Sequence, residues 1–488
     1  MLKLSYYSII SAPLAGKNER LAYSTRSGKA IRITEVCYEC LTQDMIGEIP
    51  KVILDPLVEA KIVVPAGEKE LDVVVNENQE YGREGIKELF EVVQPSAMCQ
   101  LGCYYCGQNH IKKNLSEGLV DKIVDRVVGK FEAGNYDSIH YGWFGAEPLM
   151  GLQQIRAIHS KTKERLPEVP ITGTMITNGL SLKPAIFQEL VFDLGVNKFE
   201  ITLDGIAEFH DKHRYTKKGG NSFDLIYQNL LDIFSREDYD TVPADIHIRC
   251  NVDRNNIDGV EPLIRKIAAD GIQKKVSALY FKSIYSWGGN DANKVSLDSE
   301  EFAYEEMKWK ILMAKLGYRL TFAPRTRRKN TCIVTGGESE VYDAYGNVFS
   351  CTEIPYAEDY PEGEVFKMGN LLKEESHTTA YPDRPLKDWY ETVKTTDKYL
   401  CHSCKLFPVC GSACPKAWVE GHPPCPSIKY NVTKELELNH LVMTSTRENI
   451  MDNLDAFAAD LKPEDFKMYH PDIEEQKKHG IYLGDVVV

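Results

Sequence analysis

Residues 98–110 read MCQLGCYYCGQNH and place three cysteines, Cys99, Cys103 and Cys106, in the spacing C-x3-C-x2-C. A loop of this length can wrap three thiolates round one face of an iron–sulfur cubane. A [4Fe–4S] cluster normally takes four thiolates, so three local ones leave one iron open for a small-molecule ligand, as catalytic metal sites require. Gly102 would let the backbone bend tightly against the cluster. The alternatives are three cysteines that are buried by chance, or a zinc site that lacks one ligand.

Strand-like and helix-like segments alternate along residues 91–318. Between the strands lie amphipathic stretches such as Leu119–Phe131, in which apolar residues recur at helical spacing. The alternation predicts βα units and a parallel sheet. Six units predict an α/β fold with an incomplete (β/α)6 barrel, whose chemistry lies at the carboxyl ends of the strands. The predicted strands are Leu89–Gln94, Ser138–Phe144, Ile171–Thr177, Lys198–Leu203, Ala244–Val252 and Val276–Ile284.

A second group of cysteines lies in residues 319–430, where Cys, Gly and Pro are dense and regular periodicity fades. A segment of this composition forms little hydrophobic core, so bound metal would have to hold it together. A structural zinc site within residues 401–425 is the alternative. The cysteines of this group are Cys332, Cys351, Cys401, Cys404, Cys410, Cys414 and Cys425.

Composition and charge argue against several classes of function. The formal net charge of −14 argues against a nucleic-acid partner. A local basic run, Arg325 to Lys329, reads as a solvated loop. The sequence shows no secretory signal and no apolar run long enough to span a membrane. We therefore expect a cytoplasmic protein, in which clustered thiols are metal ligands before they are disulfides.

The cysteine loop and the segments that follow it resemble the radical S-adenosylmethionine (SAM) superfamily. Tyr105 fits the aromatic residue that this family places before its last cysteine, and Gly145-Ala146-Glu147-Pro148 matches the family's Gly-Gly-Glu-Pro element, with Ala146 in place of the second glycine. In the family, the backbone of this element binds the ammonium of SAM. Thr177-Asn178-Gly179 ends the third strand, where relatives approach the ribose of the cofactor.

Residues 201–214 read ITLDGIAEFHDKHR and resemble a stretch of the peptide-modifying branch of that superfamily. The resemblance implies that Thr202 and Asp204 line the SAM site and that Arg214 pairs with the SAM carboxylate, which its planar fork can meet bidentately. An exposed ion pair is the alternative for Arg214. The expected SAM-binding residues are Tyr105, Gly145, Ala146, Glu147, Asn178, Thr202, Asp204, Arg214 and, as a weaker candidate, Asn251.

The seven later cysteines resemble the SPASM auxiliary-cluster domain in their spacing, C-x13-G-x4-C, then C-x2-C-x5-C-x3-C, then C. By family precedent, two auxiliary [4Fe–4S] clusters join the SAM-binding one. Fully ligated relatives carry one more cysteine just before Cys332, where this chain reads RTRRKNT. The near cluster would then have an open iron or a ligand other than cysteine. For a fourth ligand from elsewhere in the protein, Cys250 and His402 are the nearest candidates by residue type. The implied distal set is Cys401, Cys404, Cys410 and Cys425, and the implied near set is Cys332, Cys351 and Cys414.

The resemblance implies a peptide maturase. SAM would be cleaved reductively, and the resulting radical would take hydrogen from a ribosomally made precursor peptide to form a cross-link or another radical modification. A flavodoxin- or ferredoxin-type donor would supply electrons. Residues 1–90 are predicted to form a winged-helix-like module that holds the leader peptide at a sheet edge, with Cys37 and Cys40 in structural positions. Residues 431–488 read as an acidic helical tail.

Three alternatives remain open. A sulfatase maturase, which makes formylglycine, carries a catalytic Asp directly after the cysteine that matches Cys351, whereas Thr352 and Glu353 follow here. An RNA-modifying radical enzyme is disfavoured by the acidic charge. A plain electron-transfer protein would have no need of the Gly145–Pro148 element or of Arg214. The sequence identifies no catalytic acid or base.

Overall fold

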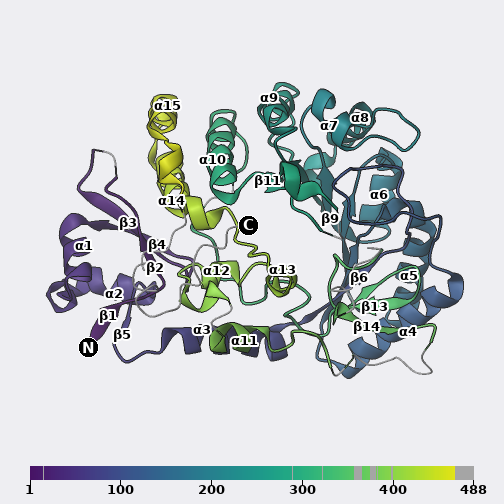
Figure 1. The fold of residues 1–488 in the computed structure, drawn as a ribbon, viewed down its shortest axis with the longest axis horizontal. Helices are drawn as coiled ribbons and strands as arrows, with labels where there is room; N and C mark the ends of the chain where they lie inside the picture. Colours follow the sequence, from purple (N-terminus) through teal and green to yellow (C-terminus); the bar gives the residue numbers. More distant parts are fainter. Residues whose placement is uncertain are drawn as a thin grey trace.

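The computed structural model describes residues 1–14, 16–287, 290–320, 323–356, 365–373, 381, 383–396 and 399–467 (Figure 1). Residues 468–488 of the predicted tail lie outside the described part. Among the described residues, no helix is both long and apolar enough to cross a membrane.

A nine-stranded sheet forms the centre of the molecule, in the order β11-β10-β9-β8-β7-β6-β12-β13-β14. The strands from β6 to β11 run parallel, and the two ends of this sheet stay apart, so the barrel is open. All six predicted strands are confirmed, with ends that shift by at most two residues. They are β6 (Glu88–Val93), β7 (Ser138–Trp143), β8 (Ile171–Thr177), β9 (Val196–Thr202), β10 (Asp245–Val252) and β11 (Ala278–Ser283).

Helices cover the outer face of these strands (Figure 1). In the first of them, α4 (Glu117–Ala133), the apolar residues Val120, Ile123 and Val127 recur at helical spacing and are buried against the sheet. The remaining helices of this layer are α5 (Leu152–Arg165), α6 (Pro184–Phe192), α7 (Ala207–His213), α8 (Phe223–Phe234), α9 (Val260–Ala269) and α10 (Ser299–Lys315).

The N-terminal unit, predicted to be a winged-helix-like module, combines two small sheets with helices. A two-stranded sheet and a three-stranded sheet, in the order β2-β3-β4, enclose the helices with a small core that includes Cys37 and Cys40. The elements are β1 (Leu2–Leu4), β2 (Ser8–Ile10), β3 (Glu19–Ser24), β4 (Ala30–Thr34), α1 (Glu35–Thr42), α2 (Lys51–Glu59), β5 (Val63–Pro65) and α3 (Glu70–Glu80).

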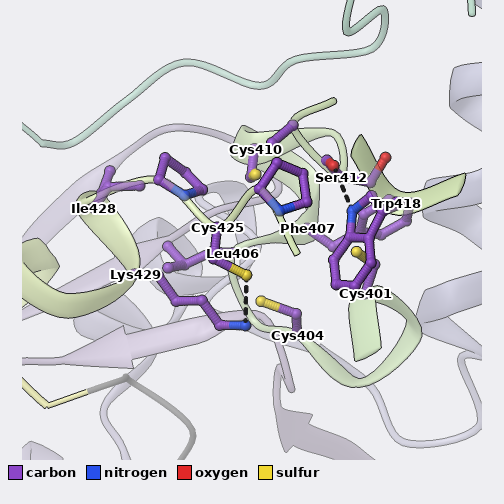
Figure 2. Close-up of a pocket in the computed structure, with 13 residues that line it drawn as sticks. Cys401, Cys404, Leu406, Phe407, Cys410, Ser412, Trp418, Cys425, Ile428 and Lys429 are labelled. Carbon is purple, nitrogen blue, oxygen red and sulfur yellow. Dashed lines mark hydrogen bonds between the residues drawn. The ribbon is translucent and has the colours of Figure 1, made fainter. Parts of the chain in front are cut away.

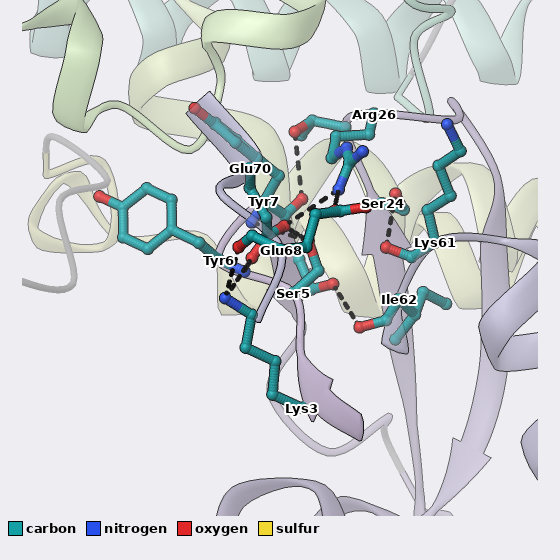
Figure 3. A network of polar contacts seen from close by, with 12 residues as sticks. Lys3, Ser5, Tyr6, Tyr7, Ser24, Arg26, Lys61, Ile62, Glu68 and Glu70 are labelled. Atoms are coloured by element: carbon teal, nitrogen blue, oxygen red, sulfur yellow. Dashed lines mark hydrogen bonds and ion pairs between the residues drawn. The ribbon is translucent and has the colours of Figure 1, made fainter. Parts of the chain in front are cut away.

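A buried ionic network ties this unit together (Figure 3). The Arg26 guanidinium, at the end of the β3–β4 hairpin, pairs with Glu68 and Glu70 at the start of α3. Glu70 also accepts hydrogen bonds from the Ser5 hydroxyl and from the Tyr6 backbone N–H. The network therefore fixes the hairpin, the first loop and α3 relative to one another.

The cysteine-rich region completes the sheet and then turns into short helices. Strands β12 (Val341–Tyr342), β13 (Asn347–Phe349) and β14 (Lys367–Asn370) extend the barrel sheet, because β12 pairs parallel to β6. The helices are α11 (Trp389–Thr395), α12 (Phe407–Cys410), α13 (Pro415–Val419), α14 (Ile428–Thr444) and α15 (Ile450–Asp460). The last two pack on α10.

The N-terminal unit shares a hydrophobic core with this region. Tyr7 and Tyr23 lie in one buried cluster with Trp389, Phe407 and Trp418. The N-terminal unit is therefore docked on the cysteine-rich region through a common core.

Candidate active site

The first cysteine loop follows β6 at the carboxyl edge of the sheet. Burial is the main cause that raises the pKa of the Cys99 and Cys103 thiols to about 11, and the negative charge of Glu147 adds to the effect at Cys99. Three thiols in this environment stay protonated unless a metal takes them as thiolates. The chemistry of this donor set thus fits the three-thiolate side of an iron–sulfur cluster.

Gly102 allows a second segment of the chain to lie close against the cysteine loop. A Cβ at Gly102 would lie 2.6 Å from the Tyr215 ring, and the Gly102 N–H donates to the Tyr215 carbonyl at 2.9 Å. Lys217 N–H donates to the Gln100 carbonyl at 2.8 Å. The need for glycine therefore comes from the segment after α7, which closes over the cysteine loop.

The Gly145–Pro148 element turns sharply after β7. Gly145 has a φ of 85° and Ala146 a φ of 43°, both in the left-handed region, so Ala146 adopts a backbone conformation that favours glycine. A Cβ at Gly145 would lie 2.3 Å from Cδ of the buried Gln94 side chain. The Ala146 N–H donates to Gln108 Oε1 at 2.8 Å, which holds the turn beside the cysteine loop.

Glu147 positions neighbouring parts of the site through hydrogen bonds. Its buried carboxylate accepts hydrogen bonds from the Leu149 N–H (3.0 Å), the Thr177 hydroxyl (2.7 Å) and the Asn178 N–H (2.8 Å). Asn178 in turn directs its amide Nδ2 to Cys99 Sγ at 3.7 Å and to Gln100 Oε1 at 3.1 Å. Glu147 thus fixes the turn after β8 against the cysteine loop.

Tyr105 is the centre of a polar network at the ends of β9 and β10. Its hydroxyl donates to Asp204 Oδ2 (2.5 Å) and accepts from Arg214 Nη1 (2.6 Å) and Asn251 Nδ2 (3.1 Å). The other Asp204 oxygen accepts from the Asn251 N–H at 2.8 Å. Asp204 and Asn251 therefore hold the Tyr105 hydroxyl between them. Thr202 ends β9 beside Arg249 of β10.

Arg214 retains a donor for a ligand. The side chain is buried, and its Nε has no hydrogen-bond partner in the part of the chain that the structure describes. An unsatisfied buried guanidinium N–H costs free energy, and a carboxylate would satisfy it. The predicted residues of β6 to β10 thus meet at one edge of the sheet, where Arg214 fits the carboxylate of SAM.

Four of the later thiols, which form the distal set, line one hollow (Figure 2). Leu406, Phe407 and Trp418 form its apolar wall. The buried ammonium of Lys429 donates to Cys425 Sγ at 3.3 Å. The four thiols are those of Cys401, Cys404, Cys410 and Cys425.

The near set, Cys332, Cys351 and Cys414, is a separate group. The charges of Cys414 and Cys332 raise the pKa of Cys351, after burial as the main cause. Cys250 is enclosed in the barrel core, and the His402 ring meets the Tyr399 carbonyl beside the distal set. These two candidates therefore lie outside the near set.

Glu353 is the side chain near this set that the sequence left unassigned. Its charge contributes to raising the pKa of Cys332, Cys351 and Cys414. Its Oε1 accepts a hydrogen bond from the Tyr285 hydroxyl at 2.6 Å, and its Oε2 lies 3.7 Å from Lys416 Nζ. The indication in the sequence that Glu353 belongs to this site was its position two residues after Cys351.

Across the described ranges, no three His, Cys, Asp or Glu side chains converge on a single-ion site. Thiolates that surround a four-iron cluster stand farther apart than the ligands of one ion.

Comparisons with known proteins agree with this geometry. Residues 93–236 match the model of the Radical SAM superfamily. A serine-type anaerobic sulfatase-maturating enzyme of Bacteroides thetaiotaomicron is 27% identical over 154 residues, which cover 30% of this chain and 36% of that protein. An uncharacterized protein of Synechocystis is 29% identical over 143 residues, which cover 27% and 34%. The matched part thus spans about a third of the length of these curated relatives.

Solved structures resemble a larger part of the fold. Native anSMEcpe with bound AdoMet is 16% identical and covers 77% of this chain and 100% of its own, with a TM-score of 0.52. The same protein with AdoMet and the Cp18Cys peptide is 15% identical, with the same coverage and TM-score. The family match, the cysteine loop and the open parallel sheet together assign residues 93–236 to the radical SAM superfamily of enzymes.

Proposed function

We propose that this chain is a radical SAM peptide maturase with two auxiliary iron–sulfur clusters. When bound, the open-iron [4Fe–4S] cluster and SAM supply a one-electron cleavage that yields a 5′-deoxyadenosyl radical, which takes a hydrogen atom from an unactivated carbon. The observation that carries the proposal is the juxtaposition of the three-thiol loop with the buried, half-satisfied Arg214.

The residues at the strand ends position SAM. The left-handed turn at Gly145 and Ala146 presents backbone groups to the SAM ammonium. Arg214 would pair with the SAM carboxylate through its Nε, which is free among the described residues. Tyr105 holds the guanidinium in place because Asp204 and Asn251 hold Tyr105. Glu147 and Asn178 keep the turn after β8 against the cysteine loop.

The two later thiol sets hold the auxiliary clusters. Four thiols round one hollow supply the full complement for the distal cluster. Three thiols would supply one ligand too few for the near cluster, which would leave one of its irons open to an exchangeable ligand. A substrate heteroatom could bind at that position.

The proposed partner is a precursor peptide. The order β2-β3-β4 leaves β2 and β4 as edge strands of the N-terminal sheet, and an edge strand can pair with an added peptide strand. The complex of anSMEcpe with a peptide supports a peptide substrate on this fold. A flavodoxin- or ferredoxin-type protein is the proposed electron donor.

A second candidate is the formation of formylglycine. The sulfatase-maturating relative favours it, and so does Glu353, which places a carboxylate beside the near thiols in the absence of an Asp at residue 352. The absence of an eighth cysteine just before Cys332 favours the peptide maturase.

Mass spectrometry of two peptides separates the candidates. The reconstituted protein, with SAM and a reductant under anaerobic conditions, is given a precursor peptide from a neighbouring short reading frame and, separately, a sulfatase-type serine peptide. A maturase changes the mass of the precursor and leaves no hydrazide-reactive aldehyde. Aldehyde on the serine peptide with an unchanged precursor would establish the second candidate instead.

A further inference from the structure

Lys429 occupies a position that disfavours a cation. It is the second residue of α14, at the positive end of the helix dipole, and only 4% of its surface is exposed. Burying an ammonium group costs several kcal/mol of folding free energy unless an anion lies beside it.

Among the described residues, sulfur atoms lie close to this ammonium group, and no carboxylate lies within ion-pair distance of it. Its Nζ donates to Cys425 Sγ at 3.3 Å, on the inner side of the distal hollow (Figure 2). Lys429 is therefore compensated when these sulfurs carry negative charge.

The charge of Lys429 acts differently on the two redox states of a cluster held by these thiols. Reduction adds one electron and, with no proton taken up and no bond broken, makes the cluster more negative by one unit. A fixed positive charge at hydrogen-bond distance from a ligand sulfur stabilises the reduced state more than the oxidised state. Hydrogen bonds to the sulfurs act in the same direction.

We infer that Lys429 is a positioning residue for electron transfer, which raises the reduction potential of the distal cluster so that this cluster accepts electrons within the protein. The inference rests on the proposed cluster at Cys401, Cys404, Cys410 and Cys425. It adds to that proposal a residue outside the cysteine pattern.

The test is a redox titration of the full-length chain in which Cys99, Cys103 and Cys106 are replaced by alanine, so that only auxiliary clusters contribute to the spectrum. Iron content and the midpoint potential are measured for Lys429→Met, Lys429→Gln and Lys429→Arg. Lys434→Met, at a partly exposed lysine on the same helix, is the matched control.

We expect Lys429→Met and Lys429→Gln to retain iron and to lower one midpoint. At a fixed potential, the ratio of reduced to oxidised cluster should fall at least tenfold, which is about 59 mV for one electron. Lys429→Arg should restore most of the shift, and Lys434→Met should leave both midpoints in place.

Unchanged midpoints in the two neutral variants with full iron would overturn the inference. Loss of iron in both neutral variants, with full iron and an unchanged midpoint in Lys429→Arg, would show a structural role and overturn it as well. A parent chain that holds no auxiliary iron at all would instead refute the proposed distal cluster, and the two failures are therefore distinct.

Discussion

Arg214 shows how a single buried side chain serves both the fold and a ligand. Its Nη1 holds the Tyr105 hydroxyl, while its Nε faces no partner among the described residues. The sequence could predict the residue, because the segment that ends in Arg214 resembles a family stretch. It could not predict the role of Tyr105 as the bridge to Asp204 and Asn251, because those contacts span about 100 residues or more of chain.

Replacement of Arg214 tests the SAM site. Arg214→Ala should weaken SAM binding by roughly 1.5–3 kcal/mol, since a charge-assisted hydrogen bond is lost, and iron content should stay the same. Isothermal titration with SAM measures the effect. Arg156→Ala, in an exposed ion pair with Glu189, serves as the control. Equal SAM affinity in the Arg214 variant and the wild type would refute the assignment.

At the scale of the elements, the alternation of strand-like and helix-like segments predicted all six barrel strands, because each strand carries apolar residues that are buried in the core. The sequence did not predict that β12 joins the barrel sheet beside β6. A strand of two residues carries no periodic signal, and its pairing depends on contacts with distant residues. The Glu353 contacts with Tyr285 and Lys416 were missed for the same reason.

The turn after β7 gives a prediction at this scale. Gly145→Ala should reduce SAM binding and stability, because its Cβ would meet the Gln94 side chain and its φ of 85° disfavours a side chain. We expect a cost of about 1–3 kcal/mol in urea unfolding. Gly118→Ala in α4, whose Cβ meets nothing within 4 Å, should stabilise the helix by up to ~1 kcal/mol. Equal stability of the two variants would contradict the crowded turn.

A buried ion pair joins α4 to the segment before β12. Arg126 Nε lies 2.6 Å from Glu340 Oε2, and both side chains are buried. Glu340→Gln should therefore lower the free energy of unfolding by about 3–5 kcal/mol. Asp125→Asn removes an exposed pair with Arg165 from the same helix and should cost at most about 1 kcal/mol. Urea unfolding of both variants measures the difference between their free energies of unfolding. Equal free energies would contradict a stabilising pair between the two regions.

At the scale of the whole molecule, the N-terminal unit and the cysteine-rich region form one body. The Tyr6 hydroxyl donates to the Ser403 carbonyl, and the Thr25 hydroxyl donates to the Lys405 carbonyl at 2.6 Å. Both contacts hold the loop that carries Cys401 and Cys404. The sequence predicted the unit itself but gave no sign of this docking, because the buried aromatic residues that form the shared core are far apart in the chain.

Peptide binding at the edge of this unit can be followed by hydrogen exchange. Addition of the precursor peptide should slow exchange in β4 or β2, since an added strand would pair with an edge of this sheet. Strands β7 to β9, in the middle of the barrel sheet, are the internal control and should not change. Protection that is absent from residues 1–85 would place the leader elsewhere.

Reductive cleavage of SAM is the most direct measurement. The wild-type protein, reconstituted without oxygen, should hold about ten to twelve iron atoms and release 5′-deoxyadenosine when SAM and dithionite are added. The variant with Cys99, Cys103 and Cys106 replaced by alanine should hold about four fewer and release none. If this triple variant still cleaves SAM reductively, the residue 99–106 loop is not the radical-generating site.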